Sequence, residues 1–548
     1  MSRLSPRFPC ALTLSVLLAA VPATAQTISV DTLKTLTQTL SSDAFEGRAP
    51  GTAGEEKTLA YLAEQFAKAG LKPGNNGSWF QDVPLVELTA KNVSPLTFTG
   101  AGAPLALQFG TDIVVGSYRG SPKIAVKDSD VVFVGYGINA PEKGWNDYAG
   151  VDVKGKTVII LVNDPDYQNT TLDGPFNGKA MTYYGRWTYK FDEAARQGAT
   201  AAIIVHDTVP ASYGWNVVQS SWTGPQQVAD AANNHMDQSA AVGWMQLDSA
   251  KKLFAGAGQD FEQLSAAAKI KGFKAVPLGA VKASVAFDNQ VRKHASKNVI
   301  GILPGTKAPN EYLIYTAHWD HLGRCPAAPD GDDICNGAID NASGTAALVA
   351  LAAANVKAGP TARSQVFLAV TAEESGLLGS AYYADHPVYP LAQTVAGINM
   401  DSMSMAGKTK KVTVTGAGKS ELDAYLARAL AVQGRGADPD PRPQGGGYYR
   451  SDHFSFAKRG VPMLSAGSGG ELADPAAEAR RVEGQKTRVS TYHGPKDEYN
   501  PNWDWSAAVR DLDLYFHIGR ELGNGSDWPN WLPGDEFRAI RDKSRAGG

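Results

Sequence analysis

The sequence predicts an α/β fold with a mainly parallel, mixed sheet and helices on both of its faces. From about residue 286, apolar strand-like segments alternate with helical segments, which is typical of parallel strands joined by helices. The predicted strands are 298–303, 312–316, 365–370, 395–399 and 411–415, and the predicted helices are 343–356, 376–384 and 421–432. Sheets of this kind bind ligands beyond the carboxyl ends of their strands.

The chain has 548 residues, which is more than a single domain usually holds. Between about 119 and 285, strand runs such as DVVFVGYGI and KTVIILVN occur with few clustered catalytic groups. We therefore expect a β-rich domain at 119–285, inserted between a first part (26–118) and a second part (286–548) of one catalytic domain. The first part contains a predicted amphipathic helix that ends at Gly70.

The N-terminus predicts export. Arg3 and Arg7 precede a short apolar run, and Ala23-Thr24-Ala25 provides a small-residue cleavage pattern. We expect residues 1–25 to be a signal peptide cleaved near Ala25, which leaves a periplasmic or extracellular protein. The run is too short to span a bilayer, and no other stretch predicts a stable membrane anchor. A net charge of −3 without a long basic run gives no support for nucleic-acid binding.

Two cysteines, Cys325 and Cys335, remain after the signal peptide. In an oxidising compartment, two cysteines ten residues apart in a loop rich in Pro, Gly and Asp favour a disulfide. A role as soft metal ligands is the alternative, although no CxxC spacing is present.

Two adjacent acids, Glu373 and Glu374, directly follow the predicted strand 365–370. Neighbouring carboxylates repel each other, and a half-buried carboxylate is unfavourable without a compensating charge. Two exposed glutamates in a solvated loop are one interpretation. The other is that a positive group lies next to them.

Four further stretches carry metal-binding side chains at strand ends or in loops: TAHWDHLG (His318, Asp320, His321), NGAIDNASG (Asp340), INMDSM (Asp401) and TYHGPKDE (His493). Imidazole nitrogen and carboxylate oxygen are ligands that zinc takes. The set suffices for two metals if one carboxylate bridges them, and two metals ~3.5–4 Å apart form a hydrolytic site. One glutamate of the pair can then bind metal while the other acts as a general base.

These stretches, in this order and together with EGRAPGTAGEE and NVIGILPG, resemble the secreted di-zinc aminopeptidase family that includes bacterial leucyl aminopeptidases and glutamate carboxypeptidase II. The resemblance covers nearly the whole mature chain and implies the zinc-peptidase fold. The inserted block resembles a protease-associated domain. The implied function is an exported metallo-exopeptidase that uses two Zn²⁺ per chain to remove the N-terminal residue of peptide substrates.

The resemblance also implies a role for each matching residue. One zinc would be held by His318, Asp340 and Asp401, and the other by Asp340, Glu374 and His493, with Asp340 as the bridge. Glu373 would be the general base that accepts a proton from the attacking water. Asp320 would orient His318, as metal-bound histidines usually require.

Three further expectations come from the resemblance. His321 is the competing ligand in its segment. In YYRSDHFSF, Tyr449 would stabilise the oxyanion of the tetrahedral intermediate, with Tyr448 as its nearest competitor. The peptide bond between Asp340 and Asn341 would be cis.

Other functions stay open at the level of sequence. A carboxypeptidase or dipeptidase of the same fold needs cationic groups for the substrate carboxylate, and Arg324, Arg442 and Arg450 are near in sequence. A non-catalytic, receptor-like binding protein such as the transferrin receptor is disfavoured by the full ligand set with Glu373. A glutaminyl cyclase, with one zinc and no first histidine ligand, is disfavoured by His318.

Overall fold

The computed structural model describes residues 28–100, 102–479, 481–482 and 491–546. The predicted signal peptide lies outside these residues. Within the described part, no helix combines the length and apolar character needed to cross a membrane.

The central sheet contains parallel and antiparallel neighbours. Its spatial order is β13 (Val276–Leu303), β17 (Arg363–Val370), β14 (Ala308–His318), β18 (Thr394–Asn399), β21 (Met463–Ser468), β19 (Lys411–Thr415) and β20 (Gly436–Pro439). The strands β17, β14, β18 and β21 run parallel, whereas β13 is antiparallel to β17. The predicted mixed, mainly parallel sheet is therefore confirmed, and each predicted strand lies within an observed one.

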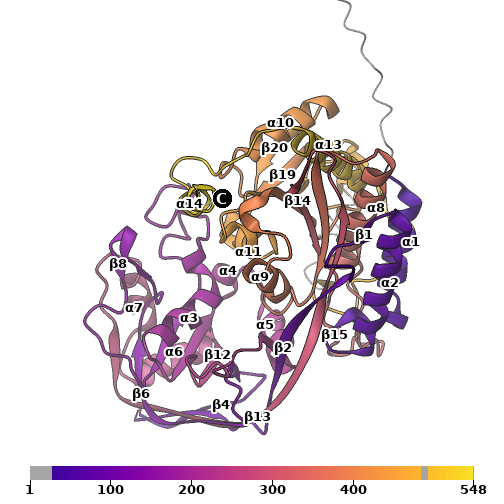
Figure 1. The fold of residues 1–548 in the computed structure, drawn as a ribbon. Helices are drawn as coiled ribbons and strands as arrows, with labels where there is room; N and C mark the ends of the chain where they lie inside the picture. Colours follow the sequence, from indigo (N-terminus) through magenta and orange to yellow (C-terminus); the bar gives the residue numbers. More distant parts are fainter. Residues whose placement is uncertain (1–27, 101, 480, 483–490, 547–548) are drawn as a thin grey trace, which may run out of the picture.

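Helices cover both faces of this sheet (Figure 1). One face packs against α1 (Val30–Leu40), α2 (Ala53–Ala69), α8 (Gly344–Lys357) and α13 (Ser506–Asn524). The opposite face packs against α9 (Leu378–Asp385) and α11 (His453–Ala457). Successive strand residues serve the two faces, as Tyr315 does on the first and Ile314 on the second. Two more helices are α10 (Leu422–Gln433), which also packs into the core of the first face, and α14 (Arg538–Ala546) near the C-terminus.

Two helix ends illustrate how local sequence sets the elements. Helix α2 ends at Gly70, as predicted, because this residue takes a left-handed conformation with φ 92°. Helix α9 begins at Leu378 rather than at the predicted Gly376, because Gly376 and Leu377 both have positive φ and form the preceding turn.

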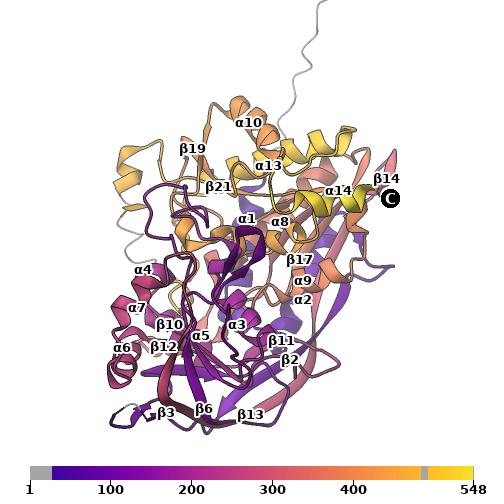
Figure 2. The ribbon, with the colours of Figure 1, turned by 90° about the vertical axis from the view of Figure 1, so that its left-hand side faces the viewer.

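A second body lies at one end of the molecule (Figures 1 and 2). Its strands are β3 (Leu96–Thr99), β4 (Leu105–Leu107), β5 (Ile113–Gly116), β6 (Lys123–Phe133), β9 (Thr157–Leu161), β10 (Ala201–His206), β11 (Gln226–Ala229) and β12 (Ala241–Gln246). Its helices are α3 (Trp187–Arg196), α4 (Thr208–Ala211), α5 (Trp215–Thr223), α6 (Leu247–Gly256) and α7 (Phe261–Ala267). Two short strands of this body are β7 (Asn139–Ala140) and β8 (Trp145–Asn146). The first body also has short strands: β1 (Lys72–Pro73), β15 (Gly323–Arg324) and β16 (Ile334–Cys335).

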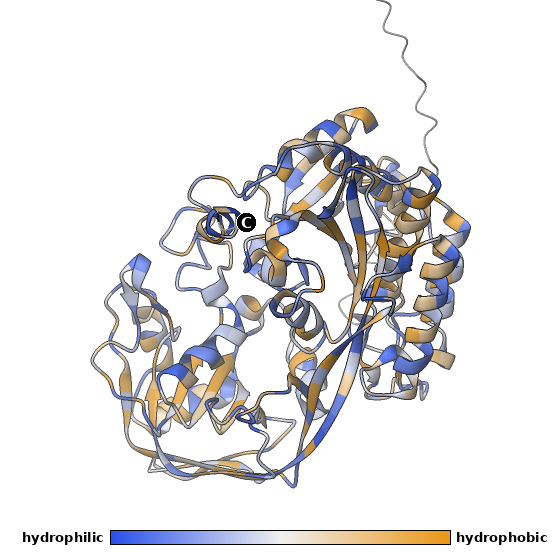
Figure 3. Ribbon diagram, viewed as in Figure 1, coloured by the Kyte–Doolittle hydropathy of each residue, from blue (hydrophilic) through white to orange (hydrophobic). Residues whose placement is uncertain are grey.

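The two bodies have separate hydrophobic cores, seen as orange strands in each part of Figure 3. The paired strands β2 (Phe80–Lys91) and β13 run from one body into the other. Strands β3 to β5 contribute Leu96, Phe98, Leu107, Ile113 and Val115 to the core of the second body. An inserted domain bounded at 119 and 285, and its protease-associated character, stay predictions.

Candidate metal centre

Three neighbouring strands end at the same edge of the central sheet, and each delivers a polar side chain there. His318 is the last residue of β14, Glu373 and Glu374 follow β17, and Asp401 follows β18. Asp340 comes from the turn before α8. His493 comes from a loop far along the chain, ahead of α13.

The structure brings the five predicted ligands together around Asp340. Asp340 Oδ1 lies 3.4 Å from His318 Nε2, and Asp340 Oδ2 lies 3.5 Å from His493 Nε2. His318 Nε2 is also 3.6 Å from Asp401 Oδ1, and His493 Nε2 is 3.0 Å from Glu374 Oε2. The two oxygens of one carboxylate thus face two different histidines, each with a further carboxylate beside it.

These residues fit zinc. Tetrahedral ligands that lie 2.0–2.1 Å from one ion are about 3.4 Å from each other, close to three of the four distances above. The Nε2 atoms of His318 and His493 are buried and have no hydrogen-bond partner among the described residues. Buried imidazole nitrogens are rarely left unpaired in this way, and a metal would satisfy both.

The backbone around Asp340 holds it between the strand ends. The Asp340–Asn341 peptide bond is cis, which confirms that prediction. Asn341 Oδ1 accepts hydrogen bonds from the N–H groups of Gly344 and Ser402, both at 3.0 Å. Because a Cβ at Gly344 would lie 2.7 Å from the Met400 oxygen, only glycine allows this approach of α8 to the end of β18. The Asp340 turn and the Asp401 loop are fixed relative to one another.

Carboxylates dominate the electrostatics of the cluster. Burial lowers the pKa of His493, but Glu374 and Asp340 outweigh it and raise that pKa to about 10. Burial likewise opposes the ionisation of Glu374, but His493 brings its pKa down to about 2. The carboxylates of the cluster therefore stabilise positive charge in the site, as the raised pKa of His493 shows.

Glu373 is placed next to the ligands and differs from its neighbour. One of its carboxylate oxygens lies within 4.8 Å of ligand atoms of His318 and Asp401. Burial, opposed by His318 and reinforced by Glu374 and Asp401, raises its pKa well above the usual range. A cation bound nearby would favour its ionised form.

Asp320 does more than the prediction assigned to it. Its carboxylate lies 3.8 Å from His318 Nδ1, and the closer acceptor for that nitrogen is the Asp320 backbone oxygen at 3.2 Å. The carboxylate instead accepts hydrogen bonds from the backbone N–H groups of Glu373 (3.1 Å) and Glu374 (3.4 Å). It thereby fixes the backbone of both glutamates.

His321, the competing metal ligand, and Tyr449, the predicted oxyanion residue, lie in different surroundings. His321 Nδ1 lies 2.5 Å from the second carboxylate oxygen of Glu374, so it orients the side chain of that predicted ligand. Tyr449 lies in an aromatic cluster with Tyr448 and Phe454, and its hydroxyl donates to Glu536 at 3.4 Å. The role of Tyr449 at the oxyanion stays a prediction.

Sequence reasoning missed two residues that position the ligand loops. Asp497 accepts hydrogen bonds from the backbone N–H groups of Ile339 and Asp340, both at 3.0 Å. The buried Arg48 donates to the backbone oxygens of Trp319, Asn336 and Gly337 at 2.7–3.0 Å. Arg48 lies within EGRAPGTAGEE, so its segment was recognised but its function was not.

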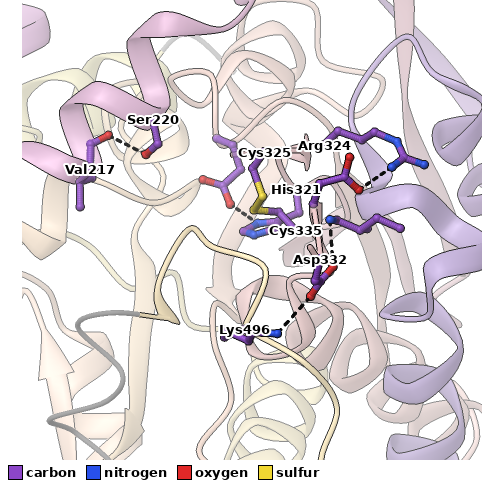
Figure 4. The surroundings of a disulfide bond; sticks show 11 residues. Val217, Ser220, His321, Arg324, Cys325, Asp332, Cys335 and Lys496 are labelled. Atoms are coloured by element: carbon purple, nitrogen blue, oxygen red, sulfur yellow. Dashed lines mark hydrogen bonds and ion pairs between the residues drawn. A yellow bond between two sulfur atoms is a disulfide. The ribbon is translucent and has the colours of Figure 1, made fainter. Parts of the chain in front are cut away.

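The predicted disulfide between Cys325 and Cys335 is present. It joins the short strands β15 and β16 beside His321 (Figure 4). Lys496, from the loop that carries His493, reaches Asp332 at 3.5 Å in the same region. The loop between His318 and Asp340 is thus tied both to itself and to the His493 segment.

The three arginines considered for a substrate carboxylate differ in their surroundings. Arg324 is exposed and paired with Asp333 at 2.6 Å, and Arg442 is exposed. Arg450 is half-buried and lies in the field of Glu373. A second arginine in that field, Arg186, comes from the second body, and nothing in its sequence context suggested such a position.

Comparison with known proteins identifies the segment that carries the ligands. Residues 298–517 match the sequence model of Peptidase family M28. All five predicted ligands and Glu373 fall within this M28 segment, and the match confirms the family resemblance seen in the sequence.

Two curated relatives match part of the chain. Aminopeptidase YwaD of Bacillus subtilis (strain 168) is 30% identical over 215 residues, which cover 39% of this chain and 41% of that protein. Leupeptin-inactivating enzyme 1 of Streptomyces exfoliatus is 29% identical over 250 residues, which cover 45% of this chain and 52% of that protein. The chain thus spans about two fifths to half of the length of these curated relatives.

A solved structure matches nearly the whole chain. The aminopeptidase from Aneurinibacillus sp. strain AM-1 aligns over 92% of this chain and 96% of its own, with a TM-score of 0.52 and 19% identity. This similarity shows that the two chains share a fold that extends over both bodies.

Proposed function

We propose that the protein is an exported two-zinc aminopeptidase that removes the N-terminal residue of peptides. The observation that carries the proposal is Asp340, whose two carboxylate oxygens face His318 and His493 separately. One oxygen for each of two metals is the arrangement that a bridging ligand requires. Asp401 would complete the first zinc site, and Glu374 would complete the second.

Zinc at these ligands would polarise the scissile carbonyl and lower the pKa of the attacking water. Glu373 accepts the proton of that water and delivers it to the leaving amine. The hydrogen bond from its backbone N–H to Asp320 fixes the backbone from which this side chain extends. Glu374 is held by His321 and His493, which suits a ligand rather than a base.

The preference for a free N-terminus follows from charge. Glu373, Glu374 and Asp401 make the rim of the site negative, so an ammonium group is attracted to it. The second body, proposed to be a protease-associated domain, narrows access and favours short or flexible chain ends. Export after cleavage near Ala25 agrees with the disulfide, because such bonds persist in oxidising compartments.

A peptide panel tests the proposal. The purified protein is incubated with zinc and with pairs of peptides that differ only in N-acetylation. We expect release of the first residue from the free peptides, about two zincs per chain by elemental analysis, and loss of activity after chelation that zinc restores. N-acetyl peptides cleaved as fast as their free partners would overturn the aminopeptidase assignment, and activity after exhaustive chelation would overturn the metal site.

A further inference from the structure

A cavity of about 550 Å³ lies between the start of α1 and the start of α13. Its volume is within the roughly 300–1,000 Å³ of sites that bind small molecules. None of the predicted metal ligands lines it, although Lys408 of its wall follows Asp401 in the chain and Trp503 follows His493. The mechanism proposed above gives this cavity no role.

Three of the residues that line the cavity are cationic: Lys34, Lys408 and Arg510. Arg510 donates to two backbone oxygens, at 2.9 and 3.4 Å, but no carboxylate among the described residues forms an ion pair with any of the three. Burial, followed by the like charge of Arg435, lowers the pKa of Arg510, although neighbouring acids on α13 oppose the shift. Three cations that share one cavity without an anionic partner favour the binding of an anion.

The acid in this lining, Asp504, is held by the protein itself. Its Oδ1 accepts a hydrogen bond from the backbone N–H of Ser506 at 2.9 Å, in the first turn of α13. Its own N–H donates to the Met405 oxygen at 3.2 Å. The wall therefore has two positive charges in excess, next to the positive end of the α13 helix dipole.

Two polar groups in the wall also lack partners. Trp505 is only 3% exposed, and its indole Nε1 has no hydrogen-bond partner in the described part of the chain. The same holds for the buried hydroxyl of the next residue, Ser506. Both residues line the cavity, and buried donors are rarely left unpaired. The structure thus lacks hydrogen-bond acceptors where it also lacks negative charge.

The rest of the wall is apolar. Val30, Trp503 and Val509 line the cavity and are each half-buried. The Trp503 ring is fixed edge-on to that of Trp505, with centres 6.0 Å apart. A bare inorganic anion would leave this apolar surface exposed to water, whereas an anion that carries an apolar group would cover it.

We propose that this cavity binds a small organic acid, whose carboxylate pairs with Lys34, Lys408 and Arg510 and whose apolar group packs on Trp503. The site is a second ligand site beside the metal centre, and it does not depend on the proposed peptidase function.

Matched probes test the site. The zinc-loaded protein is titrated by calorimetry, at low salt, with phenylacetate, with its neutral analogue phenylacetamide and with inorganic phosphate. We expect phenylacetate to bind at least about 10-fold more tightly than the amide, because only the acid makes charge-assisted hydrogen bonds. Equal binding of acid and amide, or no binding of the acid, would overturn the proposal. Phosphate bound as tightly as phenylacetate would overturn the organic-acid assignment.

Lysine variants locate the binding. In the double variant Lys34→Met/Lys408→Met, the affinity for phenylacetate should fall about 10-fold, since each half-exposed or exposed pairing contributes up to about 1 kcal/mol. Arg510 is left in place because its backbone contacts support the fold. The control, Lys410→Met, removes a nearby exposed lysine that pairs with Glu471 and should bind like wild type. Unchanged affinity in the double variant, shown by circular dichroism to be folded, would contradict the site.

A last arm excludes binding through zinc, because carboxylates also bind metals. Phenylacetate is titrated into Glu374→Gln protein and into wild-type protein after chelation. We expect the wild-type affinity in both, since no predicted metal ligand lines the cavity. Affinity that is lost in these two samples but kept in the lysine double variant would place the acid at the metal centre and overturn the proposal. Peptide hydrolysis is not measured here, so a failure of the peptidase function leaves this result intact.

Discussion

Two groups of buried charged side chains, one in each body of the molecule, differ in how their polar atoms are satisfied. In the second body, the buried Lys190 donates to the backbone oxygens of Tyr136 (2.6 Å) and Asn163 (3.0 Å). Asp147 accepts from the Ile138 N–H and the Trp145 indole. Asp164 accepts from the backbone and the hydroxyl of Thr182. Every charged atom of this group has a partner inside the protein.

In the M28 segment, by contrast, buried charged groups converge and several stay unsatisfied. The Nε2 atoms of His318 and His493 and both carboxylate oxygens of Asp452 lack hydrogen-bond partners in the described part of the chain. A satisfied group of buried charges stabilises a fold, whereas an unsatisfied and mostly acidic one indicates a cation that completes it. The comparison thus separates structural from functional charge.

The largest effect is expected within the functional group. Glu373→Gln should keep both zincs and lower kcat by about 10²–10⁴-fold, because only the proton carrier is removed. Glu374→Gln should instead reduce the zinc content, because a ligand is weakened. Elemental analysis and steady-state kinetics on both variants distinguish the two roles. Equal metal loss in both variants would contradict the assignment of proton transfer to Glu373 and of metal binding to Glu374.

The matching test in the second body is Lys190→Met. The variant leaves two backbone oxygens and two buried aspartates without the lysine, so we expect a loss of about 3–5 kcal/mol in the free energy of unfolding. Denaturant unfolding measures it. The control is Lys282→Met, which removes an exposed lysine paired with Asp130 and should cost at most about 1 kcal/mol. Lys190→Met protein as stable as wild type would contradict a structural role.

Acid should affect the M28 segment through His453. Burial lowers the pKa of this histidine to about 4, whereas an unfolded histidine has a pKa of about 6.5. Between pH 6.5 and 4 the unfolded state therefore binds more protons, and the free energy of unfolding should fall by up to about 3 kcal/mol. His453→Phe should remove this part of the pH dependence. Denaturant titrations at pH 7, 5.5 and 4 on both proteins measure it, and identical slopes would refute it.

The smallest effect is expected at the disulfide. Replacing Cys325 and Cys335 by serine should cost about 2–3 kcal/mol, the range for a cross-link that closes a short loop. Hydrogen exchange should become faster around residues 320–340 and stay unchanged in the second body. Reductant added to the wild type should reproduce this pattern. Faster exchange in both bodies would mean that the loop is not an independent unit.

The sequence predicted the sheet well because its strands are local apolar runs. Strand ends then identified His318, Glu373, Glu374 and Asp401 as neighbours, since parallel strands end at one edge. His493 and Asp340 were candidates by residue type alone, and the family resemblance assigned them to the two metals, because neither follows a strand of the sheet. The geometry that joins them to the other ligands depends on the fold.

Positioning residues were less accessible to sequence reasoning. Asp497 and Arg48 act through backbone groups of remote segments, and their residue types carry no signal for such a contact. Arg186 lies more than 100 residues before the first ligand, so only the docking of the second body reveals its position. Helix α9 began two residues later than predicted, because left-handed backbone at Leu377 delays it.

Strand β13 contributes side chains to the hydrophobic cores of both bodies. Its early residues Ala283 and Val285 belong to the core of the second body, and its late residues Val299 and Leu303 belong to that of the first. Between these two sets, residues 288–299 of β13 pair with β2, and a slip of one residue in this pairing would turn their side chains to the opposite face and displace the two sets relative to each other. An error in the pairing of β13 with β2 would therefore disturb the hydrophobic cores of both bodies. The two bodies are thus joined by a continuous hydrogen-bonded pair of strands rather than by a flexible linker.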